Sequence, residues 1–553
     1  MKLAHVHSQD GFATLIALIM VGMLTLIGIA AMSTSDDEVQ VTSNTLQEMQ
    51  AFYAAEAGLE AAAAALQLEH EKTGLPPTIM PAGHDSVNGC LVRYSTVDDG
   101  PAEHKVITVG TLTGLHAEVK SYSTNSLASS SIEESRLLMS QTFEIAEIPL
   151  FQFFAFYDGD LEIIAGPDLR EFGRVHANGD IWVQADVSLT FLSYCTAGGT
   201  IMHGLKGPGV VVAGDVLFTN AAATPVTMKE GASWLEGIDP HWYDSSVARW
   251  DGRVQDKSHG QTPISLSMVD PTADLHKMIE PADGNPDSYE HDATLKVIDN
   301  QAFVLVGGVW VDCTADMTVK GIITYVPDMF LDKREATRVD CLEIDLGLLF
   351  SEGYAPSNGV FYISQQVDDW PGVRLVNGSQ LDAPLTVVAE NPTYIKGDYN
   401  IVDKQPAAVI ADAVTFLSSA WDDSKSTGAL NQRIAVSTSA NVSFITGNLL
   451  TTALGYNGGL ENLPRLLEDW TGKDFIWTGS MVCLWESQQA VAQWGTSFMR
   501  APIRDWTYDS DLDDPANQPP GAPTARVYQR TGWQQAYVGW REDRQGIYEE
   551  KKK

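Results

Sequence analysis

The chain has 553 residues, with 72 acidic and 35 basic side chains, a net charge of −37 and a hydrophobic fraction of 44%. That fraction is enough for packed cores and the length predicts more than one domain, so disorder along the whole chain is excluded. The acidity argues against nucleic acid as a partner, because a phosphate backbone would be repelled at long range.

The segment from Phe12 to Thr34 carries no charged residue. As a helix rising about 1.5 Å per residue, it is long enough to cross a hydrocarbon core of about 30 Å. A secretory signal would have a basic start and an A-x-A-like cleavage site, and neither is present. We therefore predict a helix that inserts in a membrane, with a simple N-terminal anchor as the alternative.

The helical pattern continues beyond the apolar segment. Strong helix formers follow the charged stretch 36–38 without a proline as far as Thr73. Apolar residues recur at three- and four-residue steps, which predicts an amphipathic second half. One helix is therefore expected over 12–70, with 12–33 as the part that enters the membrane.

This region resembles the N-terminal part of type IV pilin-like proteins, and most closely the PilX-type minor pilins. The resemblance rests on the Gly11-Phe12 junction after a short leader (1–11), on the apolar half-helix, and on the stretch QAFYAAEAGLEAA at 50–62. It implies that prepilin peptidase cleaves after Gly11 and leaves Phe12 as the mature N-terminus.

The same resemblance implies a location and partners. The subunit would wait in the bacterial inner membrane as a single-pass protein and meet the inner-membrane assembly platform there. It would then enter a pilus on the extracellular surface, where its helix packs against other pilin-like subunits.

The fifth residue of the mature chain would be Ile16. Major pilins have a glutamate at this position, where it meets a neighbour's N-terminal amine, and an unpaired charge in an apolar filament core is costly. An isoleucine fits a subunit that need not neutralise the next amine, as at the tip of a filament. Loss of the pair throughout this branch of proteins is the equal alternative.

Segments 90–97, 104–112, 116–124 and 135–145 alternate apolar and polar residues between turn-forming residues. This predicts an antiparallel meander over 71–147 that the amphipathic helix end covers. Helix and meander together would form an α+β pilin-like module.

Short β-prone runs separated by Gly, Asn and Asp corners fill 148–451. Such spacing is typical of a β-helix or another solenoid, and a β-sandwich is the alternative. The remaining region, 452–553, is rich in tryptophan, and we expect those rings to pack it against the solenoid rather than to stack sugars or grip a subunit. Patches of 150–540 also resemble the C-terminal region of long bacterial proteins with a PilX-type N-terminus, which implies no activity.

No catalytic residue is predicted, and the chain is not expected to be an enzyme. Acidic residues with a Gly-rich turn nearby are first of all turn residues. A polysaccharide-active β-helix enzyme, which would use paired carboxylates, is the alternative. The carboxylates weighed for that role are Asp158, Asp160, Glu162, Asp398, Asp412, Asp422 and Asp423.

One acidic loop is a candidate for calcium. Asp509, Asp511 and Asp513 alternate within DSDLDDPANQPPG and offer the hard oxygen ligands that Ca²⁺ prefers, although the EF-hand pattern is absent. His176 and His203 are expected to be structural rather than metal ligands. The five cysteines lack any C-x-x-C motif, and Cys313 with Cys341 is the first choice if a disulfide forms.

Together these observations predict a minor or tip pilin-like subunit that displays a large acidic β-rich domain for assembly or adhesion. A major subunit of a thick, decorated filament is the second alternative, beside the surface enzyme.

Overall fold

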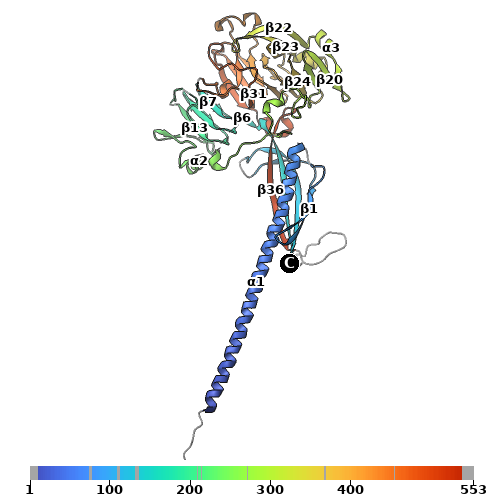
Figure 1. The fold of residues 1–553 in the computed structure, drawn as a ribbon. Coiled ribbons are helices and arrows are strands. Elements are labelled where there is room, and N and C mark those ends of the chain that lie inside the picture. The colour runs from blue at the N-terminus through green and yellow to red at the C-terminus, as the bar shows by residue number, and fades with distance from the viewer. Residues whose placement is uncertain are drawn as a thin grey trace, which may run out of the picture.

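The computed structural model describes residues 10–73, 77–108, 112–130, 136–207, 209–212, 214–270, 272–366, 369–453 and 455–537. Helix α1 (Asp10–Thr73) begins as a free rod, and its second half lies on a narrow antiparallel sheet (Figure 1). A much larger β-rich module lies beyond the far end of that sheet. The leader residues 1–9 and the C-terminal lysines lie outside the described residues.

The second half of α1 contacts the sheet through small residues. Ala51, Ala54, Ala55 and Ala62 are almost fully buried, with Leu59 and Leu66 among them. At Gly58 the approach is closest, since a Cβ there would lie 2.2 Å from the Ser126 Oγ and 2.7 Å from a Val92 methyl group. The stretch AAEAGLEAAAAAL therefore lets the helix axis lie close to the sheet.

The narrow sheet is antiparallel, in the order β1-β2-β4-β5-β36, with β3 added beside β4. Its strands are β1 (Ala82–Val87), β2 (Cys90–Asp98), β3 (Glu103–Val106), β4 (His116–Ser130), β5 (Arg136–Pro149) and β36 (Thr524–Tyr537). Four of these follow the predicted segments of the meander, whereas β1 lies before the first of those segments and β36 comes from the far end of the chain.

Strand β36 pairs with β5 from Thr524 opposite Pro149 to Tyr537 opposite Leu137, with one register shift between Thr531 and Gln534. It also contacts the helix, where Arg530 forms an ion pair with Glu60 and Trp533 packs near Phe52. The large module, residues 150–523, is thus inserted between two neighbouring strands of the sheet that carries α1.

A neck joins the two modules. The Leu150 amide donates to the Pro523 carbonyl over 3.0 Å, so the chain leaves and returns at the same point. Glu147 accepts hydrogen bonds from Ser267 and Thr524 at 2.6 Å and from Arg526 at 2.7 Å. One hydrophobic core runs through the neck, with Ile148 and Phe151 packed with residues of both modules.

The large module is built mainly from parallel ladders of short strands. Successive segments of the chain, called coils below, each add one strand to these ladders. A 12-stranded sheet runs in the order β18-β12-β9-β6-β34-β31-β28-β26-β24-β19-β20-β21. Its inner face forms the main core, in which Phe361, Val387, Val409, Phe444, Met481 and Ala155 lie side by side. Both faces are buried along the central strands β6, β24, β26, β28 and β31, which explains why most of these strands are continuous apolar runs.

The first coils of the module come early in the sequence and stack on the last ones, because β6 pairs in parallel with β34. They comprise η1 (Leu150–Gln152), β6 (Phe153–Tyr157), β7 (Leu161–Ala165), β8 (Leu169–Glu171), β9 (Arg174–Ala177), β10 (Ile181–Ala185), β11 (Ser188–Phe191), β12 (Cys195–Ala197), β13 (Ile201–His203) and β14 (Asp215–Thr219).

A connecting region follows these coils. It contains β15 (Pro225–Thr227), β16 (Lys229–Glu230), β17 (Ser233–Trp234), α2 (Trp242–Trp250), β18 (Val254–Gln255), η2 (Lys257–His259), η3 (Leu275–Met278), β19 (Leu295–Ile298), β20 (Gln301–Val306), β21 (Val309–Asp312), α3 (Thr314–Val319), β22 (Ile323–Asp332), β23 (Thr337–Asp345) and α4 (Leu346–Ser351).

The last coils contain two further parallel ladders, β23-β25-β27-β29-β32 and β30-β33-β35. Their elements are β24 (Val360–Ser364), β25 (Pro371–Val376), β26 (Leu385–Ala389), β27 (Thr393–Lys396), β28 (Ala407–Ala411), β29 (Val414–Leu417), η4 (Asp423–Lys425), η5 (Leu430–Gln432), β30 (Thr438–Asn441), β31 (Ser443–Asn448), η6 (Leu460–Asn462), β32 (Pro464–Leu466), β33 (Asp474–Gly479), β34 (Met481–Glu486), β35 (Ile503–Tyr508), η7 (Ser510–Asp513) and η8 (Pro515–Asn517).

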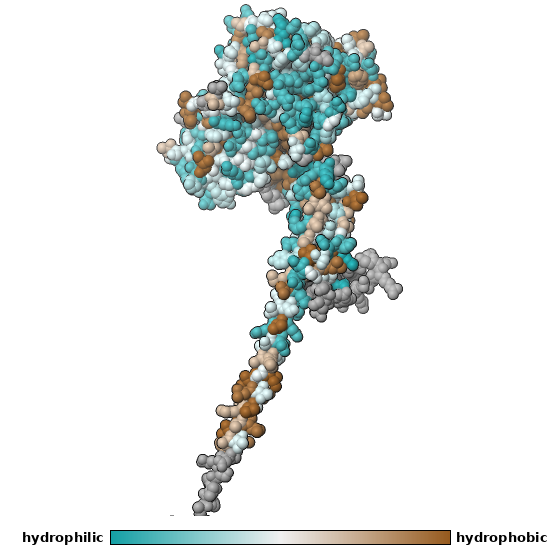
Figure 2. Space-filling model, in the orientation of Figure 1, coloured by the Kyte–Doolittle hydropathy of each residue, from teal (hydrophilic) through white to brown (hydrophobic). Residues whose placement is uncertain are grey.

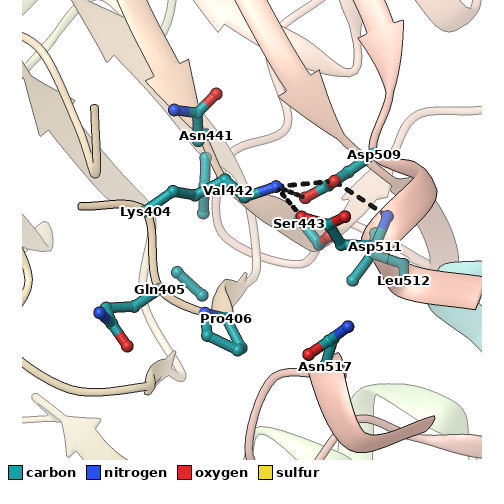
Figure 3. Close-up of a pocket in the computed structure, with 11 residues that line it drawn as sticks. Lys404, Gln405, Pro406, Asn441, Val442, Ser443, Asp509, Asp511, Leu512 and Asn517 are labelled. Atoms are coloured by element: carbon teal, nitrogen blue, oxygen red, sulfur yellow. Dashed lines mark hydrogen bonds and ion pairs between the residues drawn. The ribbon is translucent and has the colours of Figure 1, made fainter. Parts of the chain in front are cut away.

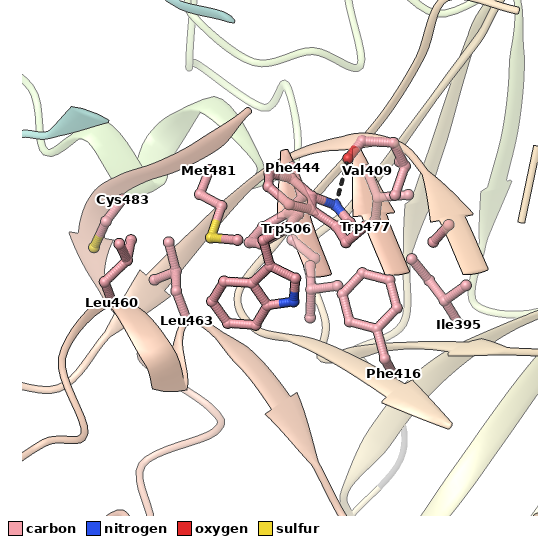
Figure 4. Close-up of a cluster of buried hydrophobic side chains, with 14 of the residues drawn as sticks. Ile395, Val409, Phe416, Phe444, Leu460, Leu463, Trp477, Met481, Cys483 and Trp506 are labelled. Carbon is pink, nitrogen blue, oxygen red and sulfur yellow. Dashed lines mark hydrogen bonds between the residues drawn. The ribbon is translucent and has the colours of Figure 1, made fainter. Parts of the chain in front are cut away.

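Residues 452–537 are spread over several of these sheets. Of the five tryptophans between 470 and 506, Trp470, Trp477, Trp485 and Trp506 are buried as packing requires, whereas Trp494 is half-buried. Trp477 and Trp506 lie beside Phe444 and Phe416 in the core (Figure 4). All five cysteines are buried and free, so Cys313 and Cys341 do not form a disulfide.

The close contact at Gly58 gives a stability prediction. We expect Gly58→Val to destabilise the helix and sheet module by about 1–3 kcal/mol, because the added side chain collides with Ser126 and Val92. Thermal unfolding followed by circular dichroism measures the loss. Gly22→Val is the matched control, since a Cβ at Gly22 meets nothing within 4 Å. Equal melting temperatures for the two variants would contradict the packing argument.

Candidate functional site

The first half of α1 is the most unusual surface of the molecule. Every residue from 12 to 46 is exposed. The most apolar stretch of the helix has a mean hydropathy of 2.6, and none of it is buried. Figure 2 shows this apolar end of the helix projecting away from the rest of the molecule. By length and composition the helix is able to cross a membrane, and nothing within the described chain covers it.

The predicted processing and assembly residues lie at the start of this rod. Gly11 and Phe12 lie in the first turn of α1, and the Phe12 side chain is 69% exposed. Ile16 is 42% exposed. Hydrogen bonds within the helix satisfy its backbone N–H and C=O groups. Its apolar side chains therefore stay available to contact lipid or other helices.

Residues 11–60 match the family model for the PilX N-terminal domain. This part of the chain is type IV pilin-like. The match covers the exposed half-helix and extends to the small-residue stretch that lies on the sheet. No curated protein matches the chain.

Among solved structures, the competence-associated pilin ComZ from Thermus thermophilus aligns with 12% sequence identity over 89% of this chain and 98% of ComZ. The TM-score is 0.25. At that value the likeness carries no argument about the fold, so the pilin-like assignment here concerns the N-terminal region.

The predicted calcium loop lies on η7 and faces a lysine. The Lys404 Nζ donates to Asp509 at 2.8 and 3.0 Å and to Asp511 at 2.6 Å (Figure 3). Asp513 accepts from the Tyr508 hydroxyl at 2.8 Å. Burial alone would lower the pKa of Lys404, but the two carboxylates raise it. The ammonium group is therefore the cation that these carboxylates hold, and the calcium site stays a prediction.

Three of the carboxylates weighed for catalysis line one cavity of about 190 Å³. Asp158 accepts from Asn178 at 2.8 Å, and Asp160 accepts from Lys206 at 2.6 Å. Glu162 accepts from Thr451, and burial raises the pKa of both Glu162 and Asp158. The structure thus brings these three acids together, each with a partner that holds it in place.

Asp160 also has a clear structural role at a corner of the coils. Its carboxylate accepts the Asp180 amide at 2.7 Å, and Asp180 in turn accepts the Thr200 amide at 2.7 Å. Each aspartate therefore fixes the corner of the next coil, as expected of turn residues.

The other carboxylates weighed for catalysis also hold loops. Asp398 accepts from the Ser439 amide at 2.8 Å, and Asp422 caps η4. Asp423 forms an ion pair with Arg374 at 2.6 Å. Asp412 is fully buried and accepts from the backbone amides of Gln488 and Ala490 at 2.6 and 2.9 Å.

His176 and His203 are both buried, on strands of different sheets. His176 bonds Thr196 at 2.8 Å and Asn178 at 3.0 Å, and His203 stacks on Trp234 with ring centroids 3.5 Å apart. Burial lowers the pKa of each to about 4. Among the described residues, no group of three His, Cys, Asp or Glu side chains could hold a metal ion.

Sequence reasoning missed Lys404, which lies 105 residues before Asp509 and is brought to it only by the stacking of distant coils. No local sequence pattern predicts such a contact. The corner residues, by contrast, could have been found from the sequence. A glycine followed by a polar residue recurs at one spacing, as Gly-Asp at 159–160 and 179–180 and as Gly-Thr at 199–200.

The Lys404 contact gives a test of the calcium prediction. If the loop binds Ca²⁺, Lys404→Ala should tighten binding roughly tenfold, equivalent to about 1.4 kcal/mol, because it removes the cation that competes for Asp509 and Asp511. Isothermal titration of calcium into both proteins measures this, with Asp511→Asn as the variant expected to weaken binding. Absence of binding heat in both the native protein and Lys404→Ala would rule the site out.

Proposed function

We propose that this chain is a prepilin-type structural subunit that prepilin peptidase cleaves after Gly11. It waits in the bacterial inner membrane, and an assembly platform then transfers it into a pilus or pseudopilus. The helix 12–33 exchanges lipid for the helices of neighbouring pilin-like subunits. The large acidic module is displayed outside, where it serves assembly or adhesion.

The observation that carries the proposal is the two-part character of α1. One unbroken helix is fully exposed and apolar in its first half, and it is seated on an antiparallel sheet by small residues in its second half. An exposed apolar surface of this size requires a lipid or protein partner. The match of residues 11–60 to the PilX N-terminal domain supports a filament of related subunits as that partner.

A minor or tip position is the further part of the proposal. Ile16 provides no carboxylate for a neighbour's amine, and the module at 150–523 is far larger than the sheet that carries it. We also propose that this module is a β-helix, since its parallel ladders stack short strands coil on coil.

The second candidate function is a polysaccharide-active surface enzyme on a pilin-type anchor. It is favoured by the gathering of Asp158, Asp160 and Glu162 around one cavity. Turnover of an acidic polysaccharide by the purified protein, lost on Asp158→Asn or Asp160→Asn, would support the enzyme over the structural subunit.

Processing is tested at the junction. Replacing Gly11 by a bulky residue should block cleavage, because the peptidase would no longer accept the junction, so the protein should keep its leader and gain mass. Intact-mass spectrometry of the membrane fraction, with and without the peptidase gene, measures the difference. Replacement of Gly22 in the same helix is the control, and unchanged mass in every strain would show that no cleavage occurs.

The position in the filament is tested by imaging. Antibodies against the large module should label filament ends or sparse points rather than the whole length. The Ile16→Glu variant, which restores a carboxylate at position five, should raise the density of labelling along the shaft. Continuous labelling of the native protein would instead support the thick, decorated filament.

A further inference from the structure

A second cavity, of about 460 Å³, lies where the first coils of the large module stack on the last ones. The corner Gly166-Pro167 and Gln184 line it from the first coils. Tyr456, Glu461, Trp494 and Arg504 line it from the last coils. Its volume falls within the range of about 300–1,000 Å³ typical of ligand pockets, and such pockets prefer junctions between units.

The backbone holds Glu461 at this cavity. The carboxylate belongs to the short turn η6, in which Leu460 and the following Leu463 pack into the core beside Cys483 and Trp506 (Figure 4). Gly459, with φ of 57°, precedes the turn and packs against the Glu162 backbone, leaving no room for a Cβ. The position of Glu461 is therefore fixed before any ligand arrives.

The polar groups of the cavity are largely without partners. Glu461 is 8% exposed, and neither of its carboxylate oxygens has a well-formed hydrogen bond within the described residues. The Tyr456 hydroxyl and the Arg504 Nε are buried and unpartnered in the same way. These polar atoms have almost no accessible surface, so a ligand in the cavity would reach them only when the lining side chains shift. Buried polar groups are normally paired, and an unpartnered set beside a cavity points to a ligand that completes it.

An aromatic wall accompanies these groups. Trp494 and Tyr456 meet edge to face with centroids 5.7 Å apart. Gly458, with φ of 92°, allows this arrangement, since a Cβ there would lie 2.5 Å from the Trp494 ring. An indole ring in the wall of a cavity offers a flat apolar face to the C–H side of a ring-shaped ligand.

The charges of the cavity favour a neutral ligand. Burial raises the pKa of the neighbouring Glu171 to about 8, so that its carboxyl group is mostly protonated near pH 7. Burial also raises the pKa of Glu461, while the nearby Arg504 guanidinium opposes the rise. Among the residues that line the cavity, Arg504 offsets Glu461, so a charged ligand would bring a charge that no lining residue balances.

We infer that this cavity binds a small neutral saccharide. Its hydroxyl groups would pair with Glu461, Tyr456 and Arg504, and its ring would stack on Trp494. The inference deepens the proposed adhesive role and rests on the proposed function only for display outside the cell. Saccharide binding itself is a property of the folded large module.

The test uses the full chain purified in a zwitterionic detergent, since sugar-based detergents would compete. Maltose, cellobiose and N,N′-diacetylchitobiose are the neutral probes, and digalacturonic acid is the charged one. Isothermal titration should show binding of at least one neutral disaccharide. Trp494→Ala and Glu461→Gln should each weaken it at least tenfold, and digalacturonic acid should not bind.

Trp310→Ala is the matched control, because Trp310 is a partly exposed tryptophan on strand β21, outside the cavity. It should bind the disaccharide like the native protein. Failure of every neutral probe to bind, equal binding by Trp494→Ala, or binding of the charged probe alone would overturn the inference. Both cavity variants should still enter filaments, so loss of saccharide binding is distinguishable from failure of the pilin-like role.

Discussion

The pairing of β36 with β5 is the interaction on which the rest of the structure depends. These strands are neighbours in space but are separated by the whole large module in sequence. Because β36 also touches α1 through Arg530 and Trp533, the module that carries the helix is complete only when the C-terminal strand is in place. The module that carries the helix and the large module are therefore folded as one unit.

Much of the N-terminal half could be predicted from the sequence, because its determinants are local. The uncharged run 12–34, the unbroken helix formers and the alternation in 90–145 each specify an element within its own length. The small residues around Gly58 form part of the motif recognised in the sequence. The structure explains why they are small, because the helix closely contacts Ser126 and Val92 there. Strand β1 was missed because its burial pattern is mostly exposed.

The topology of the large module could not be predicted in the same way. Parallel pairing of β6 with β34 and antiparallel pairing of β36 with β5 join residues more than 300 positions apart, and no period in the sequence specifies such partners. The candidate sites in the large module show the same limit to prediction from sequence. The acids at 158, 160 and 162 are close in sequence and stay together, whereas Lys404 meets Asp509 only through the stacked coils.

The neck decides how the large module moves relative to the helix. Flexible linkers would let the large module swing aside. Here, instead, two adjacent strands lead into the module, and Ser267 donates a hydrogen bond to Glu147 across the junction. Ile148 also packs in a core shared by both modules. A rigidly held body of this size would collide with equally placed copies along a thin filament, and its acidity adds repulsion between them. The rigidity of the neck thus supports the proposed minor or tip position independently of Ile16.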